Sequence, residues 1–349
     1  MGKRLSTTEK GCGAMAEKEY GEIVGSNGRP RFGIYKEPLE SFDLKELRRY
    51  GKDATGPVSA FRLKRWQYLG VCNEEVIFGL AVVDAGYLGN MFTYVFDRER
   101  KELLEFDIIH PMGLATEIKG NSLSGDVNFK SGKTDVSMKN GADSISLTSA
   151  VKGKLRAELR FERYREAMNI VTRVGLKGFN YTTKESGMAV SGTIHAGNRD
   201  FTIEPSRSSG VLDYTFGCLS HYTFWNWASG GGFDREGKRI GFNLVQGVNE
   251  TGYTENAFWI EGRMIKTDTI DFQYNDRNIL EPWRLVSNDG KVDLKFYPEG
   301  ERKKTLNLGI LMSNFHQPFG RFEGTLRDGA AEYQIETGFG FTEEHEAKW

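Results

Sequence analysis

The chain has 349 residues, a length that predicts two domains or one large β-rich unit with internal duplication. Its 47 Lys and Arg residues nearly balance its 48 Asp and Glu residues, and a net charge of −1 provides no field for gathering phosphates, which argues against nucleic acid as a partner. The 42 Gly against 8 Pro, with 23 Phe, 14 Tyr and 6 Trp, are typical of short strands joined by glycine turns and argue against a disordered chain.

The first 30 residues are predicted to form a mobile or loosely docked leader. They are rich in Gly, Lys, Glu and Ser and have no apolar period. They also lack an apolar signal core, and no stretch of the chain approaches about 18 apolar residues, so we expect a cytoplasmic protein without a transmembrane segment. Residues 1–6 fit the Met-Gly-x-x-x-Ser pattern of N-myristoylation, which on Gly2 would add a peripheral membrane association.

A first domain is predicted over residues 31–186. It begins with the one segment of helical character, residues 41–50, where Ser41 is a candidate cap and Phe42, Leu44 and Leu47 form a partial apolar stripe. An alternating run at 58–68 is followed by apolar runs at 75–84 and 89–97, and together these predict a three-stranded meander. Further short strands, separated by turn signals at 131–132 and 140–141, are predicted at 125–130, 136–138, 144–147 and 154–161.

A second series of strands begins near Gly187 and predicts a second domain over residues 187–349. A hairpin is expected across Gly197-Asn198, and the triplet 230–232 is interpreted as a flexible turn between strands. Later strands are predicted at 241–244, 257–260, 292–296 and 320–324. The whole pattern indicates an all-β fold of barrels or sandwiches with few short helices.

Standard cofactor and metal motifs are absent from the sequence. The three cysteines, Cys12, Cys72 and Cys218, include no Cys-x-x-Cys pair, so neither a disulfide scaffold nor a zinc site is predicted. There is no Gly-x-x-x-x-Gly-Lys-[Ser/Thr] loop, no Gly-x-Gly-x-x-Gly after a strand and no Gly-x-Ser-x-Gly elbow. We therefore expect no cofactor.

Polar and aromatic residues are densest at 210–227, where Asp213 and His221 are the titratable acid and imidazole. In one interpretation Asp213 is a general acid or base with a raised pKa in an aromatic pocket, aided by His221. In the other, Asp213 bonds backbone amides, and Trp225 and Trp227 are wall packing on one strand face. Residue types alone favour the second interpretation.

Three further clusters of polar residues follow. Glu255 and Lys266 are expected on neighbouring strands if Glu261-Gly262 turns a hairpin, which predicts either a salt bridge or a charged pair in a cavity. His316 lies in the cluster 314–320. His345, between two glutamates, has no comparable set of metal ligands around it, so an ion pair or a capping role is expected there.

These clusters carry a resemblance to a known family. The spans GVLDYTFG at 210–217, WNW at 225–227, IGFNL at 240–244, TENA at 254–257, PWR at 282–284, FHQPFG at 315–320 and EEHEAKW at 343–349 resemble the DUF2804 family of uncharacterised proteins, over roughly residues 30–349. More distantly, SGTI at 191–194, Asp-x-x-x-Gly at 213–217 and the Trp-x-Trp look like the second domain of carotenoid 1,2-hydratase and AttH-like proteins. That resemblance implies two lipocalin-like barrels of the calycin class and makes Asp213 the position that best matches the hydratase's proton-donating Asp.

Three functions remain open. The first is binding of a hydrophobic or amphipathic small molecule in an aromatic-lined cavity. The second is a cofactor-free hydratase, isomerase or cyclase that uses Asp213, and the third is a structural or interaction module without ligand. Nothing in the sequence indicates an oligomeric state. The predicted catalytic residues are Asp213 and His221, and the predicted ligand-binding residues are Tyr214, Trp225, Asn226, Trp227, Glu255, Asn256, Lys266 and His316.

Overall fold

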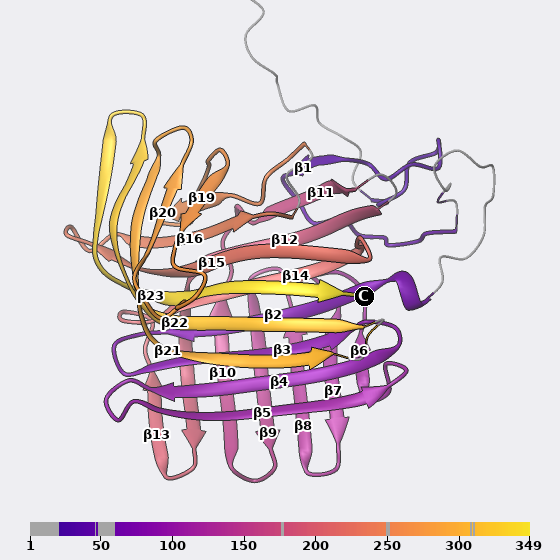
Figure 1. The fold of residues 1–349 in the computed structure, drawn as a ribbon, viewed down its shortest axis with the longest axis horizontal. Helices are drawn as coiled ribbons and strands as arrows, with labels where there is room; N and C mark the ends of the chain where they lie inside the picture. The colour runs from indigo at the N-terminus through magenta and orange to yellow at the C-terminus, as the bar shows by residue number, and fades with distance from the viewer. Residues whose placement is uncertain are drawn as a thin grey trace, which may run out of the picture.

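The structure of the chain is a computed structural model that describes residues 21–45, 47, 60–175, 178–248, 252–307, 309 and 311–349. Among these residues the regular elements are β-strands, apart from one turn of 3-10 helix at Ala60–Arg62 (Figure 1). The prediction of an all-β fold is therefore confirmed. Within the described part of the chain, no helix has the length and apolar character that a membrane crossing requires.

The strands form two large antiparallel sheets, one after the other in the chain. The first sheet has 14 strands, with the main order β5-β4-β3-β2-β14-β12-β10-β9-β8-β7-β6, while β13 and β11 pair with β12, and β1 pairs with β11. Its bounds are β1 Gly33–Tyr35, β2 Lys64–Cys72, β3 Val76–Asp84, β4 Leu88–Asp97, β5 Glu102–Pro111, β6 Thr116–Ile118, β7 Asp126–Ser131, β8 Thr134–Asn140, β9 Ser144–Val151, β10 Leu155–Glu162, β11 Met168–Val174, β12 Gly178–Ala196, β13 Arg199–Ile203 and β14 Ser209–Cys218. The predicted meander is β2-β3-β4, but its first strand is Lys64–Cys72 instead of 58–68, because Ala60–Arg62 form the 3-10 turn. The hairpin across Gly197-Asn198 joins β12 to β13.

The second sheet has nine strands in the order β18-β17-β16-β15-β23-β22-β21-β20-β19. Its bounds are β15 Tyr222–Asp234, β16 Arg239–Gln246, β17 Ala257–Ile260, β18 Arg263–Lys266, β19 Ile270–Gln273, β20 Trp283–Ser287, β21 Val292–Asn307, β22 Met312–Asp328 and β23 Ala331–Lys348. The predicted turn at Glu261-Gly262 joins β17 to β18, so Ala257 faces Lys266.

Each sheet curls around an apolar core of its own, and a third apolar cluster lies between the sheets. The first core includes Phe129, Phe161 and Tyr214, and the second includes Phe242 and Phe322. The cluster between the sheets is formed by side chains from both sheets, among them Tyr68, Tyr94, Phe319, Phe339 and Phe341. The molecule is thus two curled antiparallel half-barrels packed together, consistent with two lipocalin-like barrels. In Figure 1, β21, β22 and β23 lie over the region of β2, β3 and β4 and are nearly aligned with them.

The backbones of the two sheets come into direct contact at a pair of glycines. Gly187 has a φ of +79° and sits at the bulge between Ser186 and Met188 in β12, where it faces Gly241 of β16. A Cβ placed on Gly241 would lie 1.9 Å from the carbonyl oxygen of Ser186, so only glycine permits this backbone contact. Beside it, the hydroxyls of Ser186 and Ser229 are 2.7 Å apart and join the sheets by a buried hydrogen bond.

The glycine triplet 230–232 was expected to be a turn, and that prediction is wrong. Residues 230–232 lie inside β15, paired on both sides with β16 and β23. The physical reason is the same close approach, since a Cβ on Gly231 would lie 2.4 Å from the carbonyl oxygen of Ile240 and 3.0 Å from Gly187 Cα. Because these glycines have no side chain, the backbone of a neighbouring strand can pack against them; they do not reverse the chain direction.

The helix expected over residues 41–50 is not found where the structure describes that segment. Residues 41–45 and 47 form a bridge, a turn and irregular chain, while 46 and 48–50 lie outside the described residues. The backbone amide of Ser41 donates to the carbonyl of Gly21, and Phe42 stacks on Phe216 at 4.7 Å, so tertiary contacts override the local cap.

Part of the expected leader is buried in the first core, and the expected domain boundary lies inside a strand. Residues 1–20, with Gly2 and Cys12, lie outside the described residues, but Ile23 and Val24 of the expected leader are buried in the first core. The expected boundary between 186 and 187 falls inside β12, because Gly187 marks a bulge in a long strand. The chain passes from the first sheet to the second at residues 219–221.

Replacing Gly241 with Ala tests the contact between the sheets. We expect Gly241→Ala to lower the free energy of unfolding by about 3 kcal/mol, the upper end of the usual range for overpacking, because the new methyl group meets backbone that cannot rotate away. Urea denaturation measures the change. Gly252→Ala is the control, since nothing lies within 4 Å of a Cβ there. Equal stability of the two variants would contradict the close approach.

Candidate functional site

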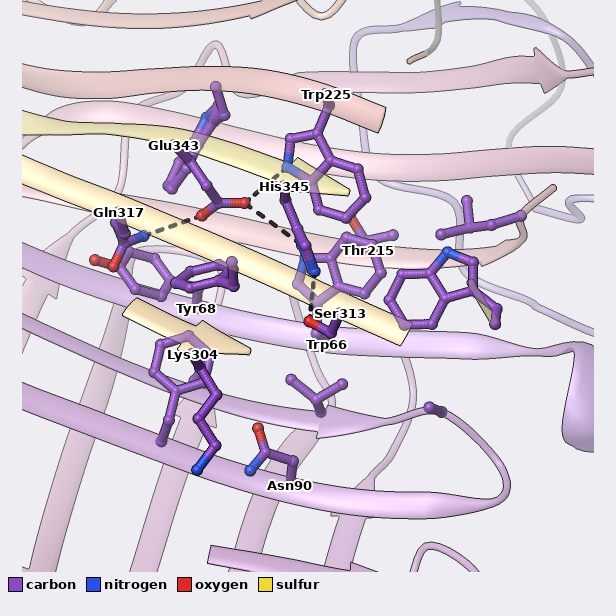
Figure 2. A pocket seen from close by; sticks show the side chains of 18 of the residues that line it. Trp66, Tyr68, Asn90, Thr215, Trp225, Lys304, Ser313, Gln317, Glu343 and His345 are labelled. Carbon is purple, nitrogen blue, oxygen red and sulfur yellow. Dashed lines mark hydrogen bonds and ion pairs between the residues drawn. The ribbon is translucent and has the colours of Figure 1, made fainter. Parts of the chain in front are cut away.

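A cavity of about 220 Å³ lies between the two sheets, at the edge of the apolar cluster that joins them. Strands β2 to β5, β12 and β14 of the first sheet form one side, and β15, β16 and β21 to β23 of the second sheet form the other. The lining is mainly aromatic and aliphatic. Its aromatic rings include Trp66, Tyr68 and Trp225, which Figure 2 labels, together with Tyr87, Phe92, Trp227, Phe315 and Trp349.

Strand alternation places these side chains in the cavity. Successive residues of a strand point to opposite faces, so Trp225 and Trp227 of β15 share one face, as do Glu343 and His345 of β23. The register sets Trp225 beside His345, and His345 beside Phe315 of β22. Three neighbouring strands therefore present one row of side chains to the cavity.

A buried cluster of three charges forms one part of the wall. The Lys184 ammonium lies 2.6 Å from Asp213 Oδ1 and 3.3 Å from Glu255 Oε2. Lys184 and Asp213 belong to the first sheet, whereas Glu255 precedes β17 of the second, so this cluster joins the sheets. Trp66 Nε1 donates to Asp213 Oδ2 at 3.2 Å, and the Thr215 hydroxyl donates to Asp213 Oδ1 at 3.3 Å.

The carboxylates around Lys184 keep it charged. Burial by itself would lower the pKa of Lys184, but the attraction of Asp213 and Glu255 outweighs burial, and the pKa of Lys184 lies above its usual value. Both oxygens of Asp213 accept hydrogen bonds, from an ammonium, an indole and a hydroxyl. These donors fix the position of the Asp213 carboxyl group in the wall.

A second polar group in the wall contains Glu343, whose carboxyl is held by neutral donors. Trp225 Nε1 donates to Glu343 Oε1 at 2.7 Å, and Gln317 Nε2 donates to Glu343 Oε2 at 3.1 Å. His345 Nδ1 lies 4.0 Å from Glu343 Oε1, and His345 Nε2 lies 2.8 Å from the Ser313 hydroxyl oxygen. Figure 2 shows these side chains in one continuous row.

Burial changes the protonation of both ionisable groups in this row. It raises the pKa of Glu343 to about 7; the Trp225 hydrogen bond opposes this rise and the Asp213 charge adds to it. It also lowers the pKa of His345 to about 3, and the Arg302 charge acts in the same direction. His345 is therefore neutral near pH 7, and Glu343 is close to half protonated.

Arg302 forms the third polar part of the wall. It is buried, and its guanidinium donates to Asp107 Oδ2 at 2.8 Å across the gap between β21 and β5. The guanidinium also lies over the rings of Phe92 and Phe315, at 4.1 Å and 5.0 Å from their centroids. This arrangement keeps a compensated cation next to an apolar surface.

Four of the sequence-predicted site residues lie together in this cavity: Asp213, Trp225, Trp227 and Glu255. Asp213 and Glu255 share the Lys184 ammonium. Trp227 donates from Nε1 to Asn243 Oδ1 at 2.8 Å while its ring faces Lys184 at 5.5 Å. Asp213 comes from β14, Trp225 and Trp227 both come from β15, and Glu255 comes from the segment before β17.

The other six predicted residues do not line the cavity: Tyr214, His221, Asn226, Asn256, Lys266 and His316. Tyr214, Asn226 and His316 are strand neighbours of lining residues, so alternation turns them to the opposite face. Tyr214 is buried in the first core, where its hydroxyl donates to the Gly120 carbonyl. Asn226 donates to the Tyr274 hydroxyl, and His316 Nδ1 lies 3.2 Å from Glu301 Oε2.

The last three predicted residues are held by hydrogen bonds to backbone groups. His221 is exposed and donates from Nδ1 to the backbone oxygen of Trp349, so it is not a partner of Asp213. Asn256 accepts from the Val245 amide and donates to the Asp268 carbonyl. Lys266 donates to the Thr254 carbonyl at 2.6 Å, and burial lowers the pKa of Lys266 to about 7.

Several residues of the wall were missed by the sequence interpretation: Trp66, Lys184, Arg302, Gln317 and Glu343. His345 was noted only as an ion-pair or capping residue. The alternation of Glu343 and His345 next to a Trp-rich strand was a usable signal, whereas Lys184 and Arg302 lie in runs of ordinary polar alternation. Among the described residues, no cluster of His, Cys, Asp and Glu could hold a metal ion.

Comparisons with known proteins agree with this fold. The model of the family described as a domain of unknown function, DUF2804, matches residues 15–349, which confirms the resemblance. No curated protein matches the sequence.

Three similar solved structures share the architecture. Kievitone hydratase from Nectria haematococca has a TM-score of 0.52 at 12% identity, covering 93% of this chain and 96% of its own. CghA has a TM-score of 0.55 at 10% identity, covering 93% and 96%. The AttH-like protein NE1406 from Nitrosomonas europaea has a TM-score of 0.51 at 15% identity, covering 85% and 96%. At these identities the likeness shows a shared fold.

Replacing Asp213 with Asn tests the charge cluster. We expect Asp213→Asn to lower the free energy of unfolding by about 1–3 kcal/mol at neutral pH, because Lys184 loses one of its two carboxylate partners in a buried site. Urea denaturation measures this loss. The control is Asp126→Asn, an exposed strand residue, for which we expect a change within about 0.5 kcal/mol. Unchanged stability of Asp213→Asn would show that the cluster does not depend on this carboxylate.

Proposed function

The chain belongs to the DUF2804 family, and from its cavity we propose that it binds a lipophilic or amphipathic small molecule between its two sheets. The observation that carries this proposal is the cavity wall itself. Aromatic rings from both sheets face a common space that also contains a few polar groups at fixed positions. Such a combination is typical of sites for small organic ligands.

Two polar atoms in the wall support an amphipathic ligand over a purely apolar one. Gln317 Oε1 and His345 Nδ1 are buried, and neither has a hydrogen-bond partner among the described residues. A buried polar atom without a partner costs free energy, so these atoms favour a ligand that offers its own hydrogen-bonding group. Both side chains line the cavity.

The similar structures are compatible with this proposal at the level of the fold. One is named a hydratase, and CghA has also been solved with Sch210972, at a TM-score of 0.52, 8% identity and coverage of 93% and 97%. The words hydratase and Sch210972 describe those solved proteins and are not properties observed for this chain. For this chain they support a small-molecule ligand as a hypothesis, and the cavity provides the independent argument.

A second candidate function is cofactor-free proton transfer on the bound molecule, as in a hydratase, isomerase or cyclase. The observation that favours it is the presence of ionisable side chains in an otherwise apolar wall. The family resemblance makes Asp213 the candidate acid. Three donors engage both of its carboxyl oxygens, however, and so favour an anchoring role for Asp213 in positioning Lys184 and Trp66.

Binding of a fluorescent amphipathic probe, anilinonaphthalene sulfonate, tests the proposed function. We expect Val83→Trp, which places an indole in the cavity wall, to weaken probe binding at least about tenfold because the space is filled. Fluorescence titration measures the affinity. The matched control is Val286→Trp, at an equally half-buried valine of β20 outside the cavity. Equal affinities of the two variants would overturn the proposal, and a wild-type chain that binds no probe would favour an interaction module.

A further inference from the structure

We propose that Glu343 is the group that exchanges a proton with the molecule bound in the cavity. This inference rests on the proposed function, since it requires a ligand between the sheets. It differs from the sequence-based expectation, in which Asp213 and His221 had that role. Four carboxyl side chains of the described residues line the cavity, and their partners distinguish them: Asp107, Asp213, Glu255 and Glu343.

The first three carboxylates are compensated by cations. Asp107 lies 2.8 Å from the Arg302 guanidinium, and Asp213 and Glu255 share the Lys184 ammonium. Each of these three carboxyl groups is thus already engaged by a cation, which holds it in place as part of an ion pair.

Glu343 has a different environment. Among the described residues, no Lys or Arg nitrogen lies within ion-pair distance of its carboxyl, which accepts hydrogen bonds from the neutral Trp225 and Gln317 side chains. The side chain is only 8% exposed. Burial raises the pKa of Glu343 to about 7, so the group can both give and accept a proton near neutral pH.

The neutral imidazole of His345 does not lower the pKa of Glu343. A protonated imidazole 4.0 Å from Glu343 Oε1 would form an ion pair and favour the carboxylate. Burial, together with the Arg302 charge, lowers the pKa of His345 to about 3, so the imidazole is neutral. Its contact with the Ser313 hydroxyl holds the ring in place.

The titratable and charged groups that act on Glu343 come from both sheets. β2, β4, β12 and β14 contribute groups from the first sheet, and β21 and β23 contribute groups from the second. They are Tyr68, Tyr94, Lys184, Asp213, Arg302 and His345. Burial raises the pKa of Tyr68 and Tyr94, so both phenols stay neutral, and the charges of Lys184 and Asp213 offset one another at short range. Glu343 is thus the group of this set that titrates near pH 7.

The proton step balances without an added oxidant or reductant. The ionised Glu343 removes a proton from a carbon next to a carbonyl group; the C–H bond breaks, its electron pair moves to the carbonyl oxygen, and a carboxylic acid O–H bond forms. Return of a proton to the ligand restores both partners. The ligand class is therefore a lipophilic molecule with an acidic C–H or an equivalent conjugated system.

Deuterium exchange into α-tetralone, an aromatic ketone, tests this role in deuterium oxide. We expect the full chain to accelerate exchange next to the carbonyl and the rate to rise with pH through about 7, because the carboxylate form is the base. Glu343→Gln should slow the catalysed exchange at least about 100-fold and remove this pH dependence. Binding of α-tetralone is followed separately through displacement of anilinonaphthalene sulfonate.

The matched control is Glu336→Gln, an exposed glutamate on the same strand, β23, which should exchange like the wild type. Glu343→Gln keeps the shape of the side chain, and Gln317 Oε1 is available to accept from the new amide, so thermal melting should show a folded variant. Exchange that persists in Glu343→Gln, or a wild type that binds the ketone without accelerating exchange, would overturn the role of Glu343 and leave the binding function standing. A wild type that binds anilinonaphthalene sulfonate but not the ketone would overturn the ligand class proposed here, and a wild type that binds neither compound would overturn both proposals.

Discussion

The buried ammonium of Lys184 is the interaction on which the arrangement of the two sheets depends. It contacts Asp213 of its own sheet and Glu255 at the edge of the other. Removing three charges from water is costly, and that cost is offset only when the charges meet each other at hydrogen-bonding distance. Any shift of one sheet along the other would separate these partners, so the cluster favours one relative position of the half-barrels.

The glycine contact acts together with this cluster. Where Gly187 meets Gly241 the two backbones touch, whereas a cluster of large aromatic side chains separates other parts of the two sheets. The space that these rings leave unfilled is the cavity. The backbone contact at the glycines and the cavity among the aromatic rings thus follow from small and large residues at defined strand positions.

The distribution of cations explains why the carboxyl groups of one cavity differ in chemistry. Lys184 and Arg302 are both engaged by other carboxylates, which leaves Glu343 to be held by an indole and an amide. Two acidic side chains in a single wall therefore have different partners: a cation for Asp213, and neutral donors for Glu343. Environment rather than residue type assigns their roles.

The amino-acid pattern was enough to predict the fold class and most of the strands, because strand alternation and glycine turns are local signals. The hairpin across Gly197-Asn198 lies where it was expected, and the meander is formed, with its first strand shifted toward the C-terminus. The amino-acid pattern also identified Trp225 and Trp227 as a shared face. It could not decide that residues 230–232 lie within a strand, that Asp213 pairs with Lys184, or that Glu343 lacks a cation. Those outcomes depend on which strands of the two sheets meet, a long-range packing result that only the tertiary structure decides.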